Sequence, residues 1–84
     1  MSDSDQILTK VQDAFQATFE VDPQSVSLET NASDIPGWDS VGHLSLASNL
    51  EQSFGISLDV DELMEMENVR QIVHILSNKL AKKV

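Results

Sequence analysis

The sequence predicts an all-α fold, a small four-helix bundle made of three main helices, one short helix and a long first loop. Apolar residues recur at steps of three and four along three segments, which is the spacing of one face of an α-helix. No segment alternates apolar and polar residues for long enough to indicate a β-strand. A chain of 84 residues suits a single domain, so we expect residues 1–84 to form one.

The first helix is predicted from about Ser4 to Phe19. Pro23 disfavours helical backbone at Asp22, so the helix ends before that residue. The apolar stripe consists of Ile7, Leu8, Val11, Ala14, Phe15 and Phe19.

Residues 20–39 read as a long loop, because they are polar and carry no helical period. Val26 and Leu28 are its candidates for the core. Pro36 and Gly37 form a turn, because proline restricts its own φ and glycine tolerates a positive φ.

The second helix is predicted from about Ser40 to Ser53. Asp39 is a good N-cap, and Gly55 is a natural stop after the last turn. The apolar stripe consists of Val41, Leu44, Ala47, Leu50 and Phe54, with Leu46 broadening it.

Two further helices follow in the C-terminal third. A short one starts after Asp59, where Glu62 completes a capping-box pattern, and the last begins at Asn68 with Gln71 at the third position. The stripe of the last helix is Val69, Ile72, Val73, Leu76 and Leu80. We expect a core that includes Leu44, Ala47, Leu50, Phe54, Ile56 and Leu76, with Met64 and Met66 as further candidates.

The charge balance narrows the range of partners. Fourteen acidic residues against five basic ones give a net charge of −9, which repels nucleic acid and anionic membranes and attracts basic protein surfaces.

The absence of cysteine excludes disulfides and cysteine-based metal sites. No apolar run is long enough for a membrane span, and the N-terminus lacks the features of a signal peptide. We therefore expect a soluble, cytoplasmic monomer.

Asp39 and Ser40 stand where a rigid turn enters a helix. One interpretation is a plain helix cap, since aspartate and serine are common at helix starts. The other is that Ser40 carries a phosphate-linked group, because a helix N-terminus offers N–H donors and a positive partial charge.

Catalytic and metal sites are weaker hypotheses. Asp39, Ser40 and His43 supply the residue types of a hydrolytic triad, but a small bundle offers neither a cleft nor an oxyanion hole. An EF-hand loop counted from Asp59 fails, because Leu63 and Met64 occupy positions that need an oxygen ligand and a glycine. We expect neither an enzyme nor a metal site.

The remaining unusual side chains suggest ordinary roles. Trp38 is expected to be a packing anchor for the turn. His74 lies off the apolar stripe and is expected to be exposed to solvent. His43 shares a face with Ser40 and is also expected to be exposed, with contact to a partner or to a group on Ser40 as the alternative.

Taken together, residues 38–58 resemble the acyl carrier protein family. The family motif is Asp-Ser-Leu at the start of the second helix, followed by an acidic stretch and Phe-Gly-Ile; here the two parts read Asp39-Ser40-Val41 and Phe54-Gly55-Ile56. The resemblance implies a carrier that is not an enzyme. It implies that a phosphopantetheinyl transferase attaches 4′-phosphopantetheine from coenzyme A to Ser40, with Asp39 contributing to recognition. The thiol of the arm would then hold acyl groups as thioesters.

The resemblance also implies partners. These are an acyl- or aminoacyl-loading ligase and downstream acyl-processing enzymes with basic surfaces. The expected contact residues are Val41, His43, Glu51, Asp59, Asp61 and Glu62.

The sequence departs from the fatty acid carriers just after the serine. Those carriers tend to hold further acids where this chain has Gly42 and Ser45. The form "GWDSVGHL" is more similar to stand-alone carriers of specialised pathways. Two alternatives stay open: an aminoacyl carrier loaded by an ATP-dependent ligase, and an acidic interaction domain without a cofactor.

Overall fold

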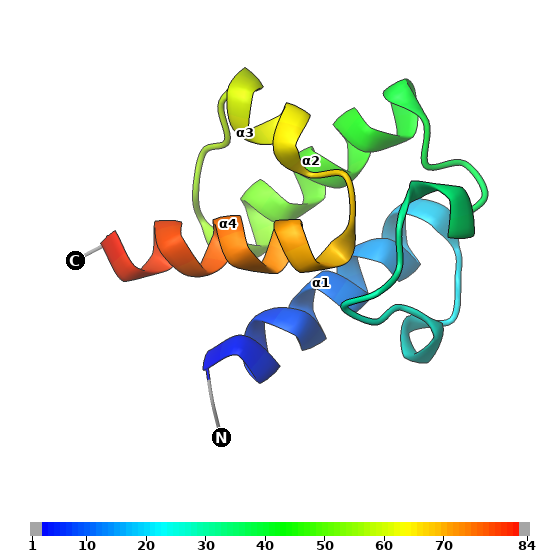
Figure 1. Ribbon diagram of the computed structural model, residues 1–84, viewed down its shortest axis with the longest axis horizontal. Coiled ribbons are helices and arrows are strands. Elements are labelled where there is room, and N and C mark those ends of the chain that lie inside the picture. Colours follow the sequence, from blue (N-terminus) through cyan, green and yellow to red (C-terminus); the bar gives the residue numbers. More distant parts are fainter. Residues whose placement is uncertain (1–2, 83–84) are drawn as a thin grey trace.

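The computed structural model describes residues 3–82, which form four α-helices and two short 3-10 helices (Figure 1). The α-helices are α1 (Asp3–Phe19), α2 (Ser40–Phe54), α3 (Val60–Glu65) and α4 (Val69–Lys82). The predicted bundle of three main helices and one short helix is therefore confirmed.

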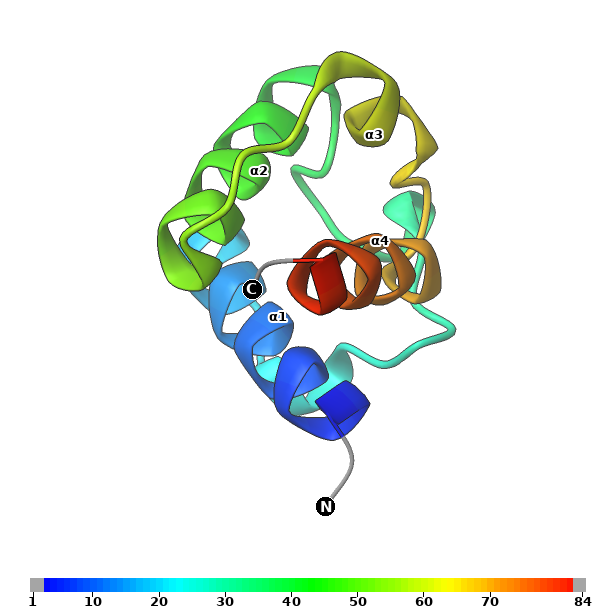
Figure 2. The same cartoon turned by 90° about the vertical axis from the view of Figure 1, so that its left-hand side faces the viewer.

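The long helices pack around one another, and α3 lies apart from the first of them. α1 contacts both α2 and α4, whereas α3 contacts α4. Figure 1 and Figure 2 both place α3 on the side of the molecule away from α1. No helix within residues 3–82 has the length and hydropathy that crossing a membrane requires.

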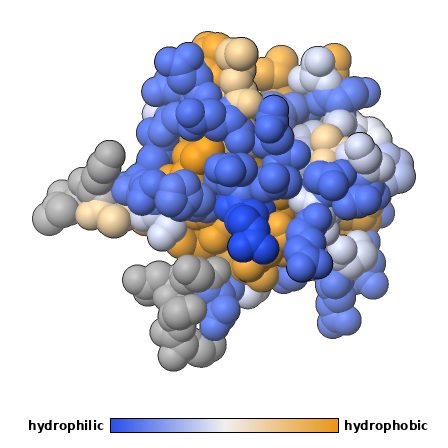
Figure 3. Space-filling view, viewed as in Figure 1, coloured by the Kyte–Doolittle hydropathy of each residue, from blue (hydrophilic) through white to orange (hydrophobic). Residues whose placement is uncertain are grey.

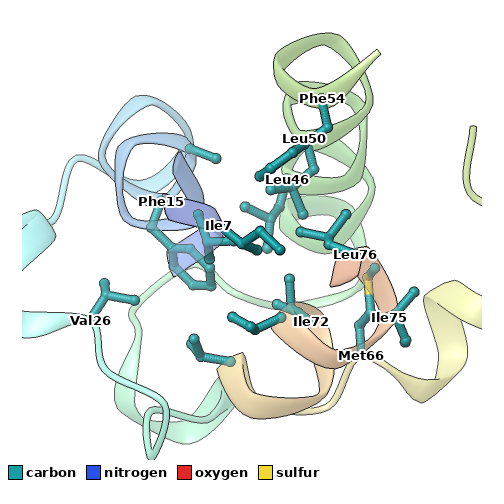
Figure 4. Close-up of a cluster of buried hydrophobic side chains, with 14 of the residues drawn as sticks. Ile7, Phe15, Val26, Leu46, Leu50, Phe54, Met66, Ile72, Ile75 and Leu76 are labelled. Atoms are coloured by element: carbon teal, nitrogen blue, oxygen red, sulfur yellow. The ribbon is translucent and has the colours of Figure 1, made fainter. Parts of the chain in front are cut away.

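The core lies where α1, α2 and α4 face one another, and Figure 4 shows their apolar side chains converging there. The predicted core residues Ala47, Leu50, Phe54 and Leu76 are buried, and Ile56 packs against the cluster while partly exposed. The largest fully buried side chains are Phe15, Leu46, Leu50, Ile72, Leu76, Val11, Val26 and Val69.

Three predicted apolar positions in α2 and α3 are exposed instead. Val41 is 74% exposed, Leu44 is 61% exposed and Met64 is 71% exposed. The prediction of one buried face that includes Val41 and Leu44 was wrong, because residues spaced three apart do not stay on the same face of a helix. From Val41 to Leu50 the accumulated rotation is about 180°, which puts the two side chains on opposite faces. Met64 likewise lies on the outer side of α3, whereas Met66 is buried.

The connection between α1 and α2 is ordered by hydrogen bonds. It contains the 3-10 helices Pro23–Ser25 and Ala32–Asp34. The buried Thr30 accepts a hydrogen bond from the Ser27 N–H at 2.9 Å, and its carbonyl accepts one from the Val69 N–H at 2.9 Å. Val26 is fully buried, as predicted, but Leu28 is 37% exposed. The hydrogen bond from Val69 thereby ties the loop to the start of α4.

The predicted helix caps are confirmed. Asp59 and Glu62 form the reciprocal capping box of α3. Asn68 accepts a hydrogen bond from the Gln71 N–H at 2.8 Å at the start of α4. Gly55 ends α2 in the left-handed conformation, with a φ of 64°.

Candidate functional site

The start of α2 is built from a turn, a cap and an exposed serine. Gly37 has a φ of +89°, and the Trp38 N–H donates to the Ile35 carbonyl at 3.2 Å to close the turn. Asp39 has extended backbone, and its Oδ1 accepts a hydrogen bond from the Gly42 N–H at 2.9 Å. Ser40 is the first residue of the helix and is exposed. Asp39 is thus the predicted N-cap, and Ser40 is exposed to solvent.

Trp38 anchors this turn to the core. Its side chain is buried, and it meets the Phe15 ring edge-on with a centroid distance of 5.0 Å. Phe19 packs beside the same indole at 6.3 Å. The prediction of a packing anchor is confirmed, and the serine therefore stands on a rigid base rather than on a mobile loop.

Gly42 lets α2 approach the turn closely, a role that sequence reasoning missed. A Cβ atom at this position would lie 2.0 Å from the Gly37 carbonyl oxygen and 2.8 Å from a ring carbon of Phe19. No side chain fits in that space. The signal in the sequence was a glycine inside a helix, which usually has a packing reason.

His43 is half-buried, so the prediction of an exposed histidine was wrong. The indole N–H of Trp38 donates to His43 Nδ1 at 2.8 Å, and His43 Nε2 lies 2.8 Å from the Leu63 carbonyl oxygen. The two rings stack at 20° with centroids 6.1 Å apart. His74, in contrast, is exposed as expected.

These contacts exclude the triad hypothesis on geometry. Both ring nitrogens of His43 are engaged by groups other than Ser40, so no base is directed at the hydroxyl. The carboxylate of Asp39 caps the helix instead of orienting the imidazole. No group of three or more potential metal ligands occurs among the residues that the structure describes.

A groove of about 270 Å³ lies beside Ser40. Its lining comes from the 3-10 helix Ala32–Asp34, from the turn and the start of α2, from α3 and from the segment that follows α3. The lining residues are Ala32, Trp38, Asp39, Ser40, His43, Leu63, Met64, Met66 and Glu67. The lining combines apolar side chains with the carboxylates of Asp39 and Glu67.

Several acids that were predicted to contact partners hold local structure. Glu51 Oε2 accepts a hydrogen bond from the Leu58 N–H at 2.8 Å. Asp59 Oδ1 accepts one from the Glu62 N–H at 2.8 Å, and Glu62 pairs with Lys79 at 2.9 Å. Asp61 is exposed.

The electrostatics of Glu62 follow from these contacts. The Asp59 backbone N–H, together with the Lys79 ammonium, holds the pKa of the Glu62 carboxyl below its ordinary value, because both favour the charged carboxylate. Glu62 therefore links α3 to α4 as an anion.

Comparison with known proteins decides the family. Residues 9–76 match the family model of the phosphopantetheine attachment site. The chain belongs to the phosphopantetheine-binding acyl carrier protein family. It is 30% identical over 76 residues to the acyl carrier protein of Petrotoga mobilis, covering 90% of this chain and 89% of that protein. It is 32% identical over 78 residues to the acyl carrier protein of Amoebophilus asiaticus, covering 93% and 98%.

A solved structure agrees with this assignment. The solution structure of the holo acyl carrier protein from Geobacter metallireducens superimposes with a TM-score of 0.81 at 33% identity, covering 90% of this chain and 87% of that one. Family members are carriers rather than enzymes, so this chain is a carrier whose cofactor is 4′-phosphopantetheine. It works with a phosphopantetheinyl transferase and with acyl-processing enzymes.

The start of α2 fits such a group. It combines an exposed serine, the N–H donors at a helix N-terminus, which favour a phosphodiester anion, and an adjacent groove that is partly apolar. When bound, the arm supplies the thiol that this cysteine-free chain lacks, and that thiol holds carboxylic acids as thioesters.

Proposed function

We propose that Ser40 Oγ is the attachment point of 4′-phosphopantetheine and that residues 1–84 act as one carrier domain. The observation that supports this most directly is the place of Ser40, exposed at the first residue of α2 directly after the Asp39 cap. The rigid base formed by Trp38 presents the hydroxyl at a defined position, which suits recognition by a transferase. We include Asp39 in that recognition.

The cargo is proposed to be an acyl group with an apolar chain. The groove beside Ser40 is lined by the apolar side chains of Trp38, Leu63, Met64 and Met66 as well as by the carboxylates of Asp39 and Glu67, and its apolar part would stabilise a hydrocarbon chain. Tethering raises the effective concentration of the cargo at a partner's active site. An aminoacyl cargo is the alternative outcome of the loading assay below.

The partner-docking surface is proposed to lie around the exposed apolar residues of α2 and α3. These are Val41, Leu44, Val60 and Met64. Residues 40–50 of α2 carry no Asp, Glu, Lys or Arg, whereas the exposed acids Asp39, Asp61 and Glu65 lie just before α2 and in α3. Hydrophobic surface gathers at the upper edge of the view in Figure 3, where Figure 1 shows α3 and the start of α2. A partner with an apolar centre and a basic rim fits this surface.

The attachment site is tested by intact-mass measurement. After incubation with coenzyme A and a promiscuous phosphopantetheinyl transferase, we expect the mass to rise by one phosphopantetheine group. Ser40→Ala should abolish the gain because it removes the accepting oxygen. Ser48→Ala, another exposed serine of α2, is the matched control and should load normally. Loading of Ser40→Ala would place the arm elsewhere and contradict the proposal.

The cargo is tested by offering the holo form to a panel of acyl- and aminoacyl-activating ligases. We expect a thioester with an apolar acyl group, detected by mass and released by hydroxylamine. Loading by aminoacyl ligases alone would contradict the acyl assignment while leaving Ser40 as the attachment site.

A further inference from the structure

A chain of two hydrogen bonds joins the turn before α2 to the C-terminal part of α3 through His43. The Trp38 indole N–H can only donate, so His43 Nδ1 must accept its hydrogen bond at 2.8 Å. The proton of the neutral imidazole is then on Nε2, which donates to the Leu63 carbonyl at 2.8 Å. The geometry thus selects one protonation state and one tautomer of His43.

α3 depends on such links for its position. It has only six residues and contains no fully buried side chain. A helix of this length does not persist by its own hydrogen bonding, so its place is set by contacts with the rest of the fold. Glu62 ties α3 to α4 through Lys79, and His43 ties it to α2 through Leu63.

The link to α2 lies at the groove beside Ser40. His43 and Ser40 of α2 line this groove together with Leu63 and Met64 of α3. A change in the separation of His43 and Leu63 therefore changes the shape of the groove.

We propose that His43 is a positioning residue that holds α3 against the start of α2 and so sets the shape of the groove that receives the arm on Ser40. The identity of the groove's ligand rests on the function proposed above, whereas the link itself is present in the chain without any arm. His43 acts here through α3 and takes no part in forming or breaking a bond.

The Trp38 indole N–H provides a signature of this arrangement. It donates to His43 Nδ1 at 2.8 Å, so removal of the imidazole takes away the acceptor of this hydrogen bond. The environment of the indole N–H should therefore change when His43 is replaced.

The first experiment records the indole N–H resonance of the single tryptophan in the apo protein at neutral pH. In the wild type and in the control His74→Gln, we expect this signal at the same position, because the hydrogen bond to His43 Nδ1 is present in both. In His43→Ala the indole signal should lie at a different position, because its acceptor has been removed. An indole signal that is identical in the wild type and His43→Ala at neutral pH would overturn the proposal.

The second experiment measures amide hydrogen exchange across residues 60–66. Loss of the Leu63 hydrogen bond in His43→Ala should speed exchange there by about tenfold, with α1 and α4 unchanged. His43→Gln should restore most of the protection, because its side-chain amide N–H can donate to the Leu63 carbonyl. Unchanged exchange in His43→Ala would contradict the proposal.

The same variants separate this proposal from the one on Ser40. Each is treated with coenzyme A and a transferase and then weighed. Failure of the wild type to gain an arm would refute the attachment site and leave the α3 exchange result standing. In the holo form, the methyl signals of Met64 and Met66 should respond to the arm less in His43→Ala than in the wild type. An equal response would show that the link does not shape the groove.

Discussion

At the scale of single residues, the geometry of the site depends on a glycine, because only a residue without a side chain fits at position 42. Gly42 brings α2 against the Gly37 carbonyl, and the turn then presents Ser40 directly after its cap. The motif around Ser40 could be predicted from the sequence because capping is a local interaction. The close approach of α2 to the turn at Gly42 could not be predicted from the sequence, because it depends on the positions of the turn and of Phe19 in the folded chain.

Gly42→Ala should therefore destabilise the fold, although alanine is the better helix former by about 1 kcal/mol. The added Cβ meets a backbone oxygen at 2.0 Å, which cannot move aside as a flexible side chain can. Such overpacking typically costs about 1–3 kcal/mol. We expect a net loss on the order of 1 kcal/mol in the free energy of unfolding, measured by urea denaturation. The control is Ser48→Ala, at an exposed position on α2, which should be neutral or slightly stabilising. A Gly42→Ala variant as stable as the wild type would contradict the prediction and show that the turn shifts to make room for the added methyl group.

At the scale of helices, local signals gave better predictions than periodicity did. The caps at Asp39, Asp59 and Asn68 were all predicted correctly, because each pairs a side chain with an amide a few residues away. Periodicity worked for α1 and α4, but it failed for α2, where apolar residues lie on two faces and Val41 and Leu44 point outward. The burial of His43 was missed for a related reason, since Leu63 is distant in the sequence.

The tie between α3 and α4 predicts a pH dependence. Because the folded-state pKa of Glu62 is lowered, its contribution to stability is fully present above the ordinary carboxylate range, about pH 4.3, and is lost as the pH falls through the folded pKa. Glu62→Gln keeps an acceptor for the Asp59 N–H but removes the ion pair with Lys79. For a partly exposed pair we expect a loss of about 0.2–1 kcal/mol at pH 7.

The measurement is chemical denaturation of the wild type and Glu62→Gln at neutral and acidic pH. The difference between them should shrink as the pH falls, since the wild-type carboxylate becomes protonated. Asp61→Asn is the control that removes one negative charge from the same helix without breaking an ion pair in the structure. A difference that is constant across this pH range would contradict the role given to Glu62.

At the scale of the whole molecule, charge is the dominant feature. With a net charge of −9 on 84 residues, repulsion among the carboxylates destabilises the folded state, because folding brings these groups closer together than they are in the unfolded chain. The Glu62–Lys79 pair opposes this repulsion locally, because it places a cation beside one of the carboxylates. The apolar surface around Val41 and Leu44 sits within this acidic field, which would steer a basic partner toward it.

The melting temperature should therefore rise with ionic strength. At about 0.1 M salt, interactions beyond about 10 Å between exposed charges are largely screened, so repulsion among the acids weakens. Mg²⁺ should act at lower concentration than K⁺, because a divalent cation screens more strongly, with no specific site required. Neutralising exposed acids, as in Glu65→Gln or Glu67→Gln, should raise the melting temperature at low salt and reduce its dependence on salt. A melting temperature that is indifferent to KCl, to MgCl₂ and to these substitutions would mean that packing alone sets the stability, and that the acidic surface serves partners without weakening the fold.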